Sequence, residues 1–165
     1  MSFDNIFSLA QITGYAAFFI GLCAYSQKRD IRLKLLSVLE NAVGIIHYFL
    51  MENPASAAIA FVSTLRSLTA MRCGNAYIAV FFVLCSILTG SYYATSWLAI
   101  LPIAGASVMT LAIFLLKGEV MRYAIILGSL LWLANNIIIG SIGGTCQELV
   151  ILVANSITII RLRLK

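Results

Sequence analysis

The sequence predicts an all-α membrane protein in which seven transmembrane helices form two parallel three-helix units joined by a linking helix. Hydrophobic residues make up 62% of the 165 residues, charged residues only 10%, and the mean hydropathy is +1.01. A soluble domain of this size cannot bury that much apolar surface. Because one crossing takes roughly 17–25 residues, the chain is long enough for six or seven crossings and for no separate extramembrane domain.

Seven apolar segments are separated by short polar breaks, and most breaks have a local physical cause. The first segment ends in the polar run from Gln27 to Arg32. Pro54 suits the first turn of the third helix, where no backbone donor is lost. Pro102 is expected to bend the fifth helix, and Thr145 to cap the last one. The predicted helices span residues 6–25, 34–51, 55–71, 76–91, 97–116, 123–139 and 145–161.

The basic residues are sorted by loop, and this sorting predicts the orientation in the membrane. The first, third and fifth loops and the C-terminal tail hold ten of the eleven Lys and Arg residues, and the other loops hold none. Short basic loops stay in the cytoplasm, so an external N-terminus and a cytoplasmic C-terminus are expected. The net charge of +5 is then attributed to anionic membrane lipids and not to nucleic acid. The ten residues are Lys28, Arg29, Arg32, Lys34, Arg72, Lys117, Arg122, Arg161, Arg163 and Lys165.

A weak internal repeat pairs the first three helices with the last three. At an offset of 89 residues, His47 aligns with Asn136 and Arg66 aligns with Asn155. Direct fusion of two three-helix units would invert the second one, and a single linking helix restores its orientation. Parallel repeats of this kind are found in transporter folds. The single membrane domain, 1–165, is therefore divided into a first unit (6–72), a linking helix (73–95) and a second unit (96–165).

Arg66 is the eleventh basic residue and is expected inside the membrane, where a charge is costly and frequently marks function. Glu40 lies six residues after Lys34, and Arg66 lies six residues before Arg72. At about 1.5 Å of rise per residue, both are about 9 Å from the cytoplasmic end, which predicts an ion pair between them. Such a pair would either lock the second helix to the third, or hold Arg66 against a water-filled cavity that admits an anionic or hydroxyl-bearing solute.

Further polar residues on the sixth and seventh helices are candidates for the same site. Trp132, Asn135 and Asn136 share one face of the sixth helix, where amides can donate and accept hydrogen bonds and an indole can stack on a solute. Asn155, near the membrane midplane, shares a face of the seventh helix with Glu148. The alternative for the amides is hydrogen bonding between helices, worth about 1 kcal/mol or less per bond.

His47 is the only histidine and shares a face of the second helix with Glu40. It is either a hydrogen-bonded packing residue or a proton-coupling group, because the unperturbed pKa of histidine is about 6.5. Glu40 and Glu148 are assigned the same supporting or proton-coupling role. One histidine and four scattered cysteines give no metal site, and no pattern predicts a cofactor or an enzyme active site.

Several segments of the chain resemble the YgjV family of bacterial inner-membrane proteins. The resemblance covers nearly the whole length, and it is carried by Gly140-Ser141-Ile142-Gly143-Gly144-Thr145, Glu148, Asn155 and Ile159-Ile160-Arg161. It implies a location in the bacterial inner membrane but brings no known function. The predicted layout is more distantly similar to SWEET sugar transporters, PQ-loop proteins and PnuC-type vitamin transporters. By analogy with SWEETs, Asn155 and Arg66 would face each other across a central cavity.

These observations predict a small-solute transporter or facilitator that alternates access around a polar site at the midplane. Its solute is expected to be a sugar, a sugar acid or another polar metabolite, and Arg66 favours an acidic one. The alternative is a sensor or a subunit that recruits partners through its basic loops, and neither is an enzyme. Small residues such as Gly14 and Gly44 can pack within or between protomers, so the sequence is compatible with a monomer and with a homo-oligomer. The predicted binding residues are Arg66, Asn155, Trp132, Asn135 and Asn136, with Glu40, His47 and Glu148 in support.

Overall fold

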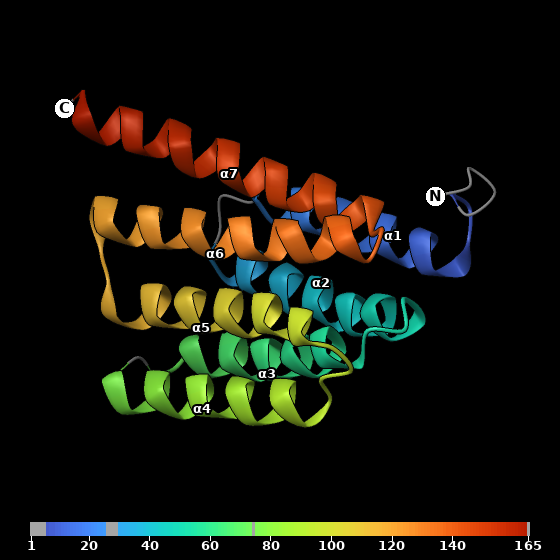
Figure 1. Cartoon of the computed structure of the whole chain (residues 1–165). Helices are drawn as coiled ribbons and strands as arrows, with labels where there is room; N and C mark the ends of the chain where they lie inside the picture. Colours follow the sequence, from blue (N-terminus) through green and yellow to red (C-terminus); the bar gives the residue numbers. More distant parts are fainter. Residues whose placement is uncertain (1–5, 26–29, 74, 165) are drawn as a thin grey trace.

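The computed structural model describes residues 6–25, 30–73 and 75–164, and in this part the chain is helical and contains no strand (Figure 1). The predicted all-α class is therefore confirmed. A short 3₁₀ helix, η2 (Trp97–Ala99), leads directly into the fifth α-helix. The seven α-helices are α1 (Leu9–Tyr25), α2 (Asp30–Leu50), α3 (Pro54–Ala70), α4 (Ala76–Tyr92), α5 (Ile100–Leu115), α6 (Gly118–Ile138) and α7 (Ile142–Arg163).

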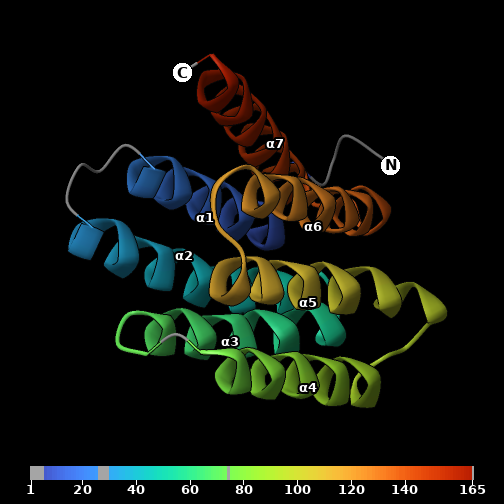
Figure 2. The same cartoon turned by 90° about the vertical axis from the view of Figure 1, so that its left-hand side faces the viewer.

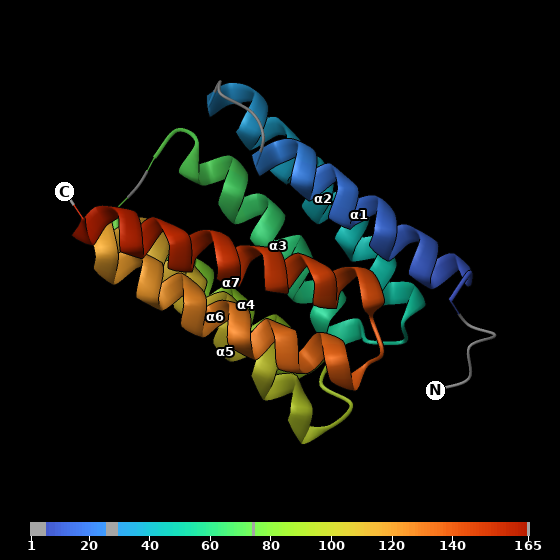
Figure 3. The ribbon, with the colours of Figure 1, turned by 90° about the horizontal axis from the view of Figure 1, so that it is seen from above.

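The helices run alternately up and down one bundle, so that each packs against the next in sequence (Figures 1 and 2). Two further contacts join distant parts of the chain, α1 with α7 and α3 with α5. The start of α1 and the α6–α7 turn lie at one end, which we call the N-terminal end of the bundle. The last residues of α7 lie at the opposite, C-terminal end. Figure 3 shows that α1 and α7 are close at the N-terminal end and diverge toward the C-terminal end.

The bundle is apolar outside and polar inside, as expected for a protein surrounded by lipid. By length and composition, three of the described helical segments can each cross a membrane: Trp97–Leu115, α6 and α7. Shorter apolar stretches, Leu9–Cys23, Val38–Leu50 and Ala76–Tyr92, belong to α1, α2 and α4. Large apolar side chains are exposed on the outside, whereas several polar side chains are almost fully buried: Ser56, Ser86, Thr110, Ser129 and Asn136.

Two helices begin earlier than predicted, because they continue past their apolar segments. α2 begins at Asp30 instead of residue 34, and α6 begins at Gly118 instead of residue 123. A hydropathy pattern detects only the part of a helix that lies in lipid, so a polar first turn resembles a loop. Among the ten Lys and Arg residues predicted on the cytoplasmic side, Lys28, Arg29 and Lys165 lie outside the described residues, as do the side chains of Arg32 and Lys34.

The last helix begins at Ile142, and its predicted cap, Thr145, is wrong. Ser141 is the N-cap residue, and its Oγ accepts a 3.1 Å hydrogen bond from the backbone N–H of Gly144. Pro102 lies in the first turn of α5, just after the 3₁₀ turn. A proline in the first turn removes no intrahelical hydrogen bond, so Pro102 fits the start of α5 and not its interior.

Candidate functional site

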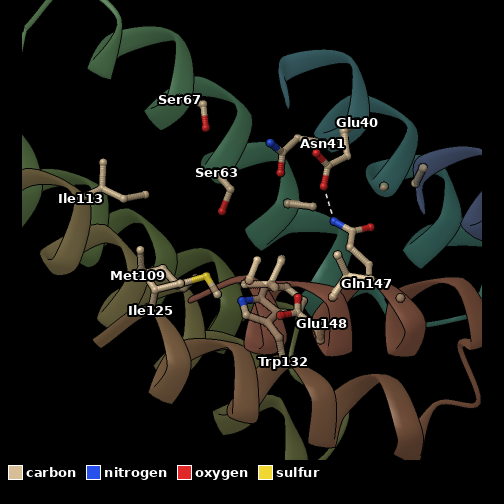
Figure 4. Close-up of a pocket in the computed structure, with 18 of the residues that line it drawn as sticks. Glu40, Asn41, Ser63, Ser67, Met109, Ile113, Ile125, Trp132, Gln147 and Glu148 are labelled. Atoms are coloured by element: carbon tan, nitrogen blue, oxygen red, sulfur yellow. Dashed lines mark hydrogen bonds between the residues drawn. The ribbon is translucent and has the colours of Figure 1, made fainter. Parts of the chain in front are cut away.

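A cavity of about 500 Å³ lies inside the bundle, enclosed mainly by α2, α3, α5, α6 and α7 (Figure 4). Six of the eight predicted site residues line it: Arg66, Asn155, Trp132, Glu40, His47 and Glu148. The other polar groups on its wall are not among the predicted site residues: Asn41, Tyr48, Ser63, Ser67, Arg122, Gln147 and Thr158. The cavity is thus rich in charged and hydrogen-bonding side chains from helices that are distant in sequence.

The ion pair predicted between Glu40 and Arg66 does not form. The Glu40 carboxylate accepts a hydrogen bond from the Gln147 side chain of α7, drawn as a dashed line in Figure 4. Arg66 instead donates from Nη1 to Thr110 Oγ1 of α5, over 3.0 Å. α2 and α3 are packed neighbours, as expected. The prediction fails because equal height on two helices does not fix the direction in which each side chain leaves its helix.

Arg66 is a buried cation held by a neutral partner. Its side chain is only 9% exposed, and it lines the cavity. Thr110 uses its own hydroxyl proton to donate to the Ala106 carbonyl at 2.7 Å, and accepts from Arg66 with a lone pair. A guanidinium has five N–H donors, and this threonine satisfies one of them. Arg66 therefore brings a cationic group with spare donors to the cavity.

Arg122 is a second cation at the cavity, although the hydropathy pattern predicts it in a loop. It lies in the second turn of α6, because that helix starts at Gly118. Its Nη1 donates to Asn155 Oδ1 at 3.1 Å, and Asn155 Nδ2 donates to the Ile151 carbonyl within α7 at 2.8 Å. Asn155 thus lines the cavity as predicted, and it also positions Arg122. The hydropathy pattern does not place Arg122 on a helix because α6 begins at Gly118, before its apolar segment.

The three polar residues predicted on one face of α6 separate into two groups. Trp132 lines the cavity, and its indole packs on Tyr48 with ring centroids 5.6 Å apart. Asn135 Nδ2 donates to Ser56 Oγ at 3.2 Å, and Asn136 Oδ1 accepts from the Tyr48 hydroxyl at 3.0 Å. Both amides are almost fully buried, and neither lines the cavity. The alternative of hydrogen bonding between helices therefore describes them better than a binding role.

His47 joins three parts of the chain at the N-terminal end of the bundle. Its Nδ1 lies 2.7 Å from the Ala10 carbonyl, and its Nε2 lies 2.7 Å from Ser141 Oγ. A carbonyl only accepts hydrogen bonds, so Nδ1 carries a proton. In the neutral ring, Nε2 then accepts from the Ser141 hydroxyl, whose oxygen also accepts from Gly144. All donors and acceptors are matched when His47 is neutral, so these bonds account for the residue as a packing group.

Close contacts between α1 and α7 seal the same end. Gln11 Nε2 donates to the Gly140 carbonyl at 2.6 Å, and Gln11 Oε1 accepts from the Ile142 backbone N–H at 3.1 Å. A Cβ atom on Gly143 would overlap the backbone of Gly14. A Cβ atom on Gly14 would in turn lie 2.8 Å from the His47 ring. Glycine at both positions is therefore required for α1, α2 and α7 to meet.

Glu148 is a second carboxyl group on the cavity wall. Its side chain is buried, and Oε2 has no hydrogen-bond partner. Figure 4 shows Glu148 near Glu40 and Gln147, on the side of the cavity away from Ser67. The Glu148 and Glu40 carboxyl groups are close enough to interact electrostatically. The cavity thus holds two carboxyl groups in addition to two guanidinium groups.

Comparisons with known proteins agree with a membrane location. The family model Imp-YgjV, described as a bacterial inner membrane protein, matches residues 8–165. The chain is similar to inner membrane protein YgjV of Escherichia coli (strain K12), with 32% identity over 157 residues, which cover 93% of this chain and 84% of that protein. No solved structure matches the chain.

Proposed function

Because this chain belongs to the YgjV family of bacterial inner membrane proteins, we propose that it moves a small polar solute across that membrane. The observation that carries the proposal is a cavity of about 500 Å³ within an apolar helical bundle, with two arginines and two glutamates on its wall. Ligand sites typically have volumes of about 300–1,000 Å³. Charged side chains inside a membrane are costly, and proteins keep them where they meet solutes, ions or water.

In the proposed orientation, the C-terminal end of the bundle faces the cytoplasm, because the predicted basic loops lie at that end. The contacts of Gln11 and His47 then close the cavity toward the outside. Arg66 lies four residues from the end of α3 and Arg122 four residues from the start of α6, about 6 Å from the cytoplasmic end of each helix. This conformation corresponds to the outward-closed state of a transport cycle.

Two units that rock against each other would provide alternating access. The first unit is α1–α3, the second is α5–α7, and α4 links them. The packing of α1 on α7 and of α5 on α3 supports this division. In the repeat, α1 corresponds to α5 and α3 corresponds to α7, so the contact between α1 and α7 corresponds to the contact between α5 and α3. Opening toward the outside would separate α1 from α7 and break the hydrogen bonds between Gln11 and the α6–α7 turn.

A thermal-unfolding screen tests whether the cavity binds a solute. The purified protein would be heated with sugars, sugar acids, amino acids, nucleosides and vitamins, and a ligand at 100 times its Kd adds about 2.7 kcal/mol of stability. We expect Arg66→Ala to abolish the effect and the control Arg72→Ala to keep it, because Arg72 is exposed and does not line the cavity. Unchanged binding by a folded Arg66→Ala protein would remove this residue from the site.

An uptake assay separates transport from sensing. Protein in sealed liposomes should accumulate the stabilising solute, and Arg66→Ala should reduce uptake to the level of empty liposomes. Arg72→Ala should transport like the wild-type protein. Binding without uptake would favour the sensor or partner-recruiting alternative. No binding of any solute class would contradict transport and solute sensing, and would favour a subunit that recruits partners.

A further inference from the structure

Among the described residues, the arginine and glutamate side chains that line the cavity form no ion pair with one another. Arg66 is held by Thr110, and Glu40 is held by Gln147, both of which are neutral. Arg122 likewise donates to a neutral amide. Within the described residues, the one ion pair joins Arg163 and Glu119 at 3.2 Å, and neither residue lines the cavity. Two cations and two carboxyl groups are thus left for something other than the protein to match.

These charges are separated along the cavity. Glu148 and Asn155, which holds Arg122, are seven residues apart on α7, which is about 10 Å of helix. Arg66 and Arg122 each lie four residues from the end of their helix at the C-terminal end of the bundle, whereas Glu148 lies six residues from the start of α7 at the N-terminal end. Figure 4 shows Glu148 and Ser67 on opposite sides of the cavity. The cavity therefore has an acidic end near Glu40 and Glu148, and a basic end near Arg66 and Arg122.

We propose that the transported solute is a zwitterion of the amino-acid type, with its ammonium group at the acidic end and its carboxylate at the basic end. This inference rests on the proposed function. A solute that is only anionic would match Arg66 and Arg122 but would leave Glu40 and Glu148 as protonated, neutral carboxyl groups, because a carboxylate without a counter-charge is too costly in a low-dielectric site. A zwitterion supplies both counter-charges and adds no net charge to the cavity.

The wall of the cavity supports this direction of binding. Trp132 lies near Glu148 in Figure 4, so an ammonium group held there would also meet an aromatic ring, which attracts cations. A guanidinium group binds a carboxylate through two parallel hydrogen bonds. The backbone rise of about 10 Å between Glu148 and Asn155, together with a hydrogen bond of about 3 Å at each end, requires a solute of only a few carbon atoms. Short amino acids meet this requirement.

The test compares solutes that differ only in charge. Wild-type protein would be titrated with α- and ω-amino acids of two to six carbons, and with the amine and the carboxylate that correspond to each. We expect the best zwitterion to bind at least tenfold more tightly than either singly charged analogue. A carboxylate or a sugar acid that binds as tightly as the best zwitterion would overturn the inference and leave the proposed transport intact.

Charge-removing variants test the direction of binding. Glu148→Gln should lower the preference for the zwitterion over its carboxylate analogue at least tenfold, with little change in carboxylate binding. Arg66→Gln should do the reverse and spare the amine analogue. Glu119→Gln, in the exposed ion pair, is the matched control and should behave like the wild type. A folded Glu148→Gln protein that keeps the preference, or that loses only the pH dependence of binding, would overturn the inference, since the carboxyl group would then hold a proton and not the solute.

Uptake measurements distinguish the two proposals. A strong preference for zwitterions with no uptake into liposomes would refute transport and leave the ligand class standing. Uptake of a singly charged or neutral solute, with no preference for zwitterions, would refute the ligand class and leave transport standing.

Discussion

The contact between Gly143 of α7 and Gly14 of α1 leads to a quantitative prediction about stability. A Cβ atom on Gly143 would overlap the backbone of Gly14, and backbone atoms cannot rotate out of the way as a side chain can. Gly143→Ala is therefore expected to force α1 and α7 apart at the N-terminal end of the bundle. Gly44 is a matched control, because nothing lies within 4 Å of a Cβ atom at that position on α2.

The expected cost follows from the bonds that cross this contact. Gln11 makes two hydrogen bonds to the α6–α7 turn, of 2.6 and 3.1 Å, and His47 makes one to Ser141, of 2.7 Å. Three such bonds contribute about 3 kcal/mol in total, and overpacking costs about 1–3 kcal/mol. Replacing glycine by alanine in a helix returns at most about 1 kcal/mol. Gly143→Ala should thus lower the free energy of unfolding by about 3–5 kcal/mol.

The measurement is the free energy of unfolding in mixed micelles, obtained by titration with a denaturing detergent. Gly44→Ala should be neutral or stabilising by up to about 1 kcal/mol, because it gains helix propensity without a clash. If Gly143→Ala is as stable as Gly44→Ala, then α1 and α7 are not packed through these glycines and the sealed end does not exist as described.

Three further predictions concern single hydrogen bonds. Thr110→Val keeps the volume of the side chain but removes the acceptor of Arg66, so the free energy of unfolding in mixed micelles should fall by about 1.5–3 kcal/mol, and an unchanged value would show that Arg66 does not depend on this partner. Ser141→Ala should cost about 1–2 kcal/mol in the same titration, since it removes both the cap of α7 and a partner of His47; no loss would contradict the assigned network. Asn135→Ala should cost about 1 kcal/mol without changing the Kd of the solute measured by calorimetry, because Asn135 lies outside the cavity; a tenfold weaker Kd would return it to the site.

The number and order of the helices could be predicted because lipid imposes a simple rule. A helix surrounded by hydrocarbon must be apolar over most of its length, and such segments are visible in any sequence. The rule stops applying where a helix leaves the lipid. For this reason the hydropathy pattern does not detect the polar first turns of α2 and α6, and it predicts Arg122 in a loop although this residue lies on α6.

The site was predictable to the extent that polarity alone decides which side chains point inward. Arg66, Glu40 and Glu148 are too costly to face lipid, and each of them lines the cavity. Amides carry no charge and can satisfy themselves between helices, so polarity could not tell cavity residues from packing residues. Asn155 lines the cavity, whereas Asn135 bonds to Ser56.

The hydropathy and charge patterns are sufficient to predict a helical bundle in a membrane, with charges inside the membrane on its second and third helices. The hydrogen-bond partners of those charges depend on the tertiary structure. Glu40 and Arg66 lie on adjacent helices, yet they bond to α7 and α5. The rotation of each helix about its axis depends on where neighbours can approach, as at Gly14 and Gly143, and these contacts join residues that are more than a hundred positions apart in the chain.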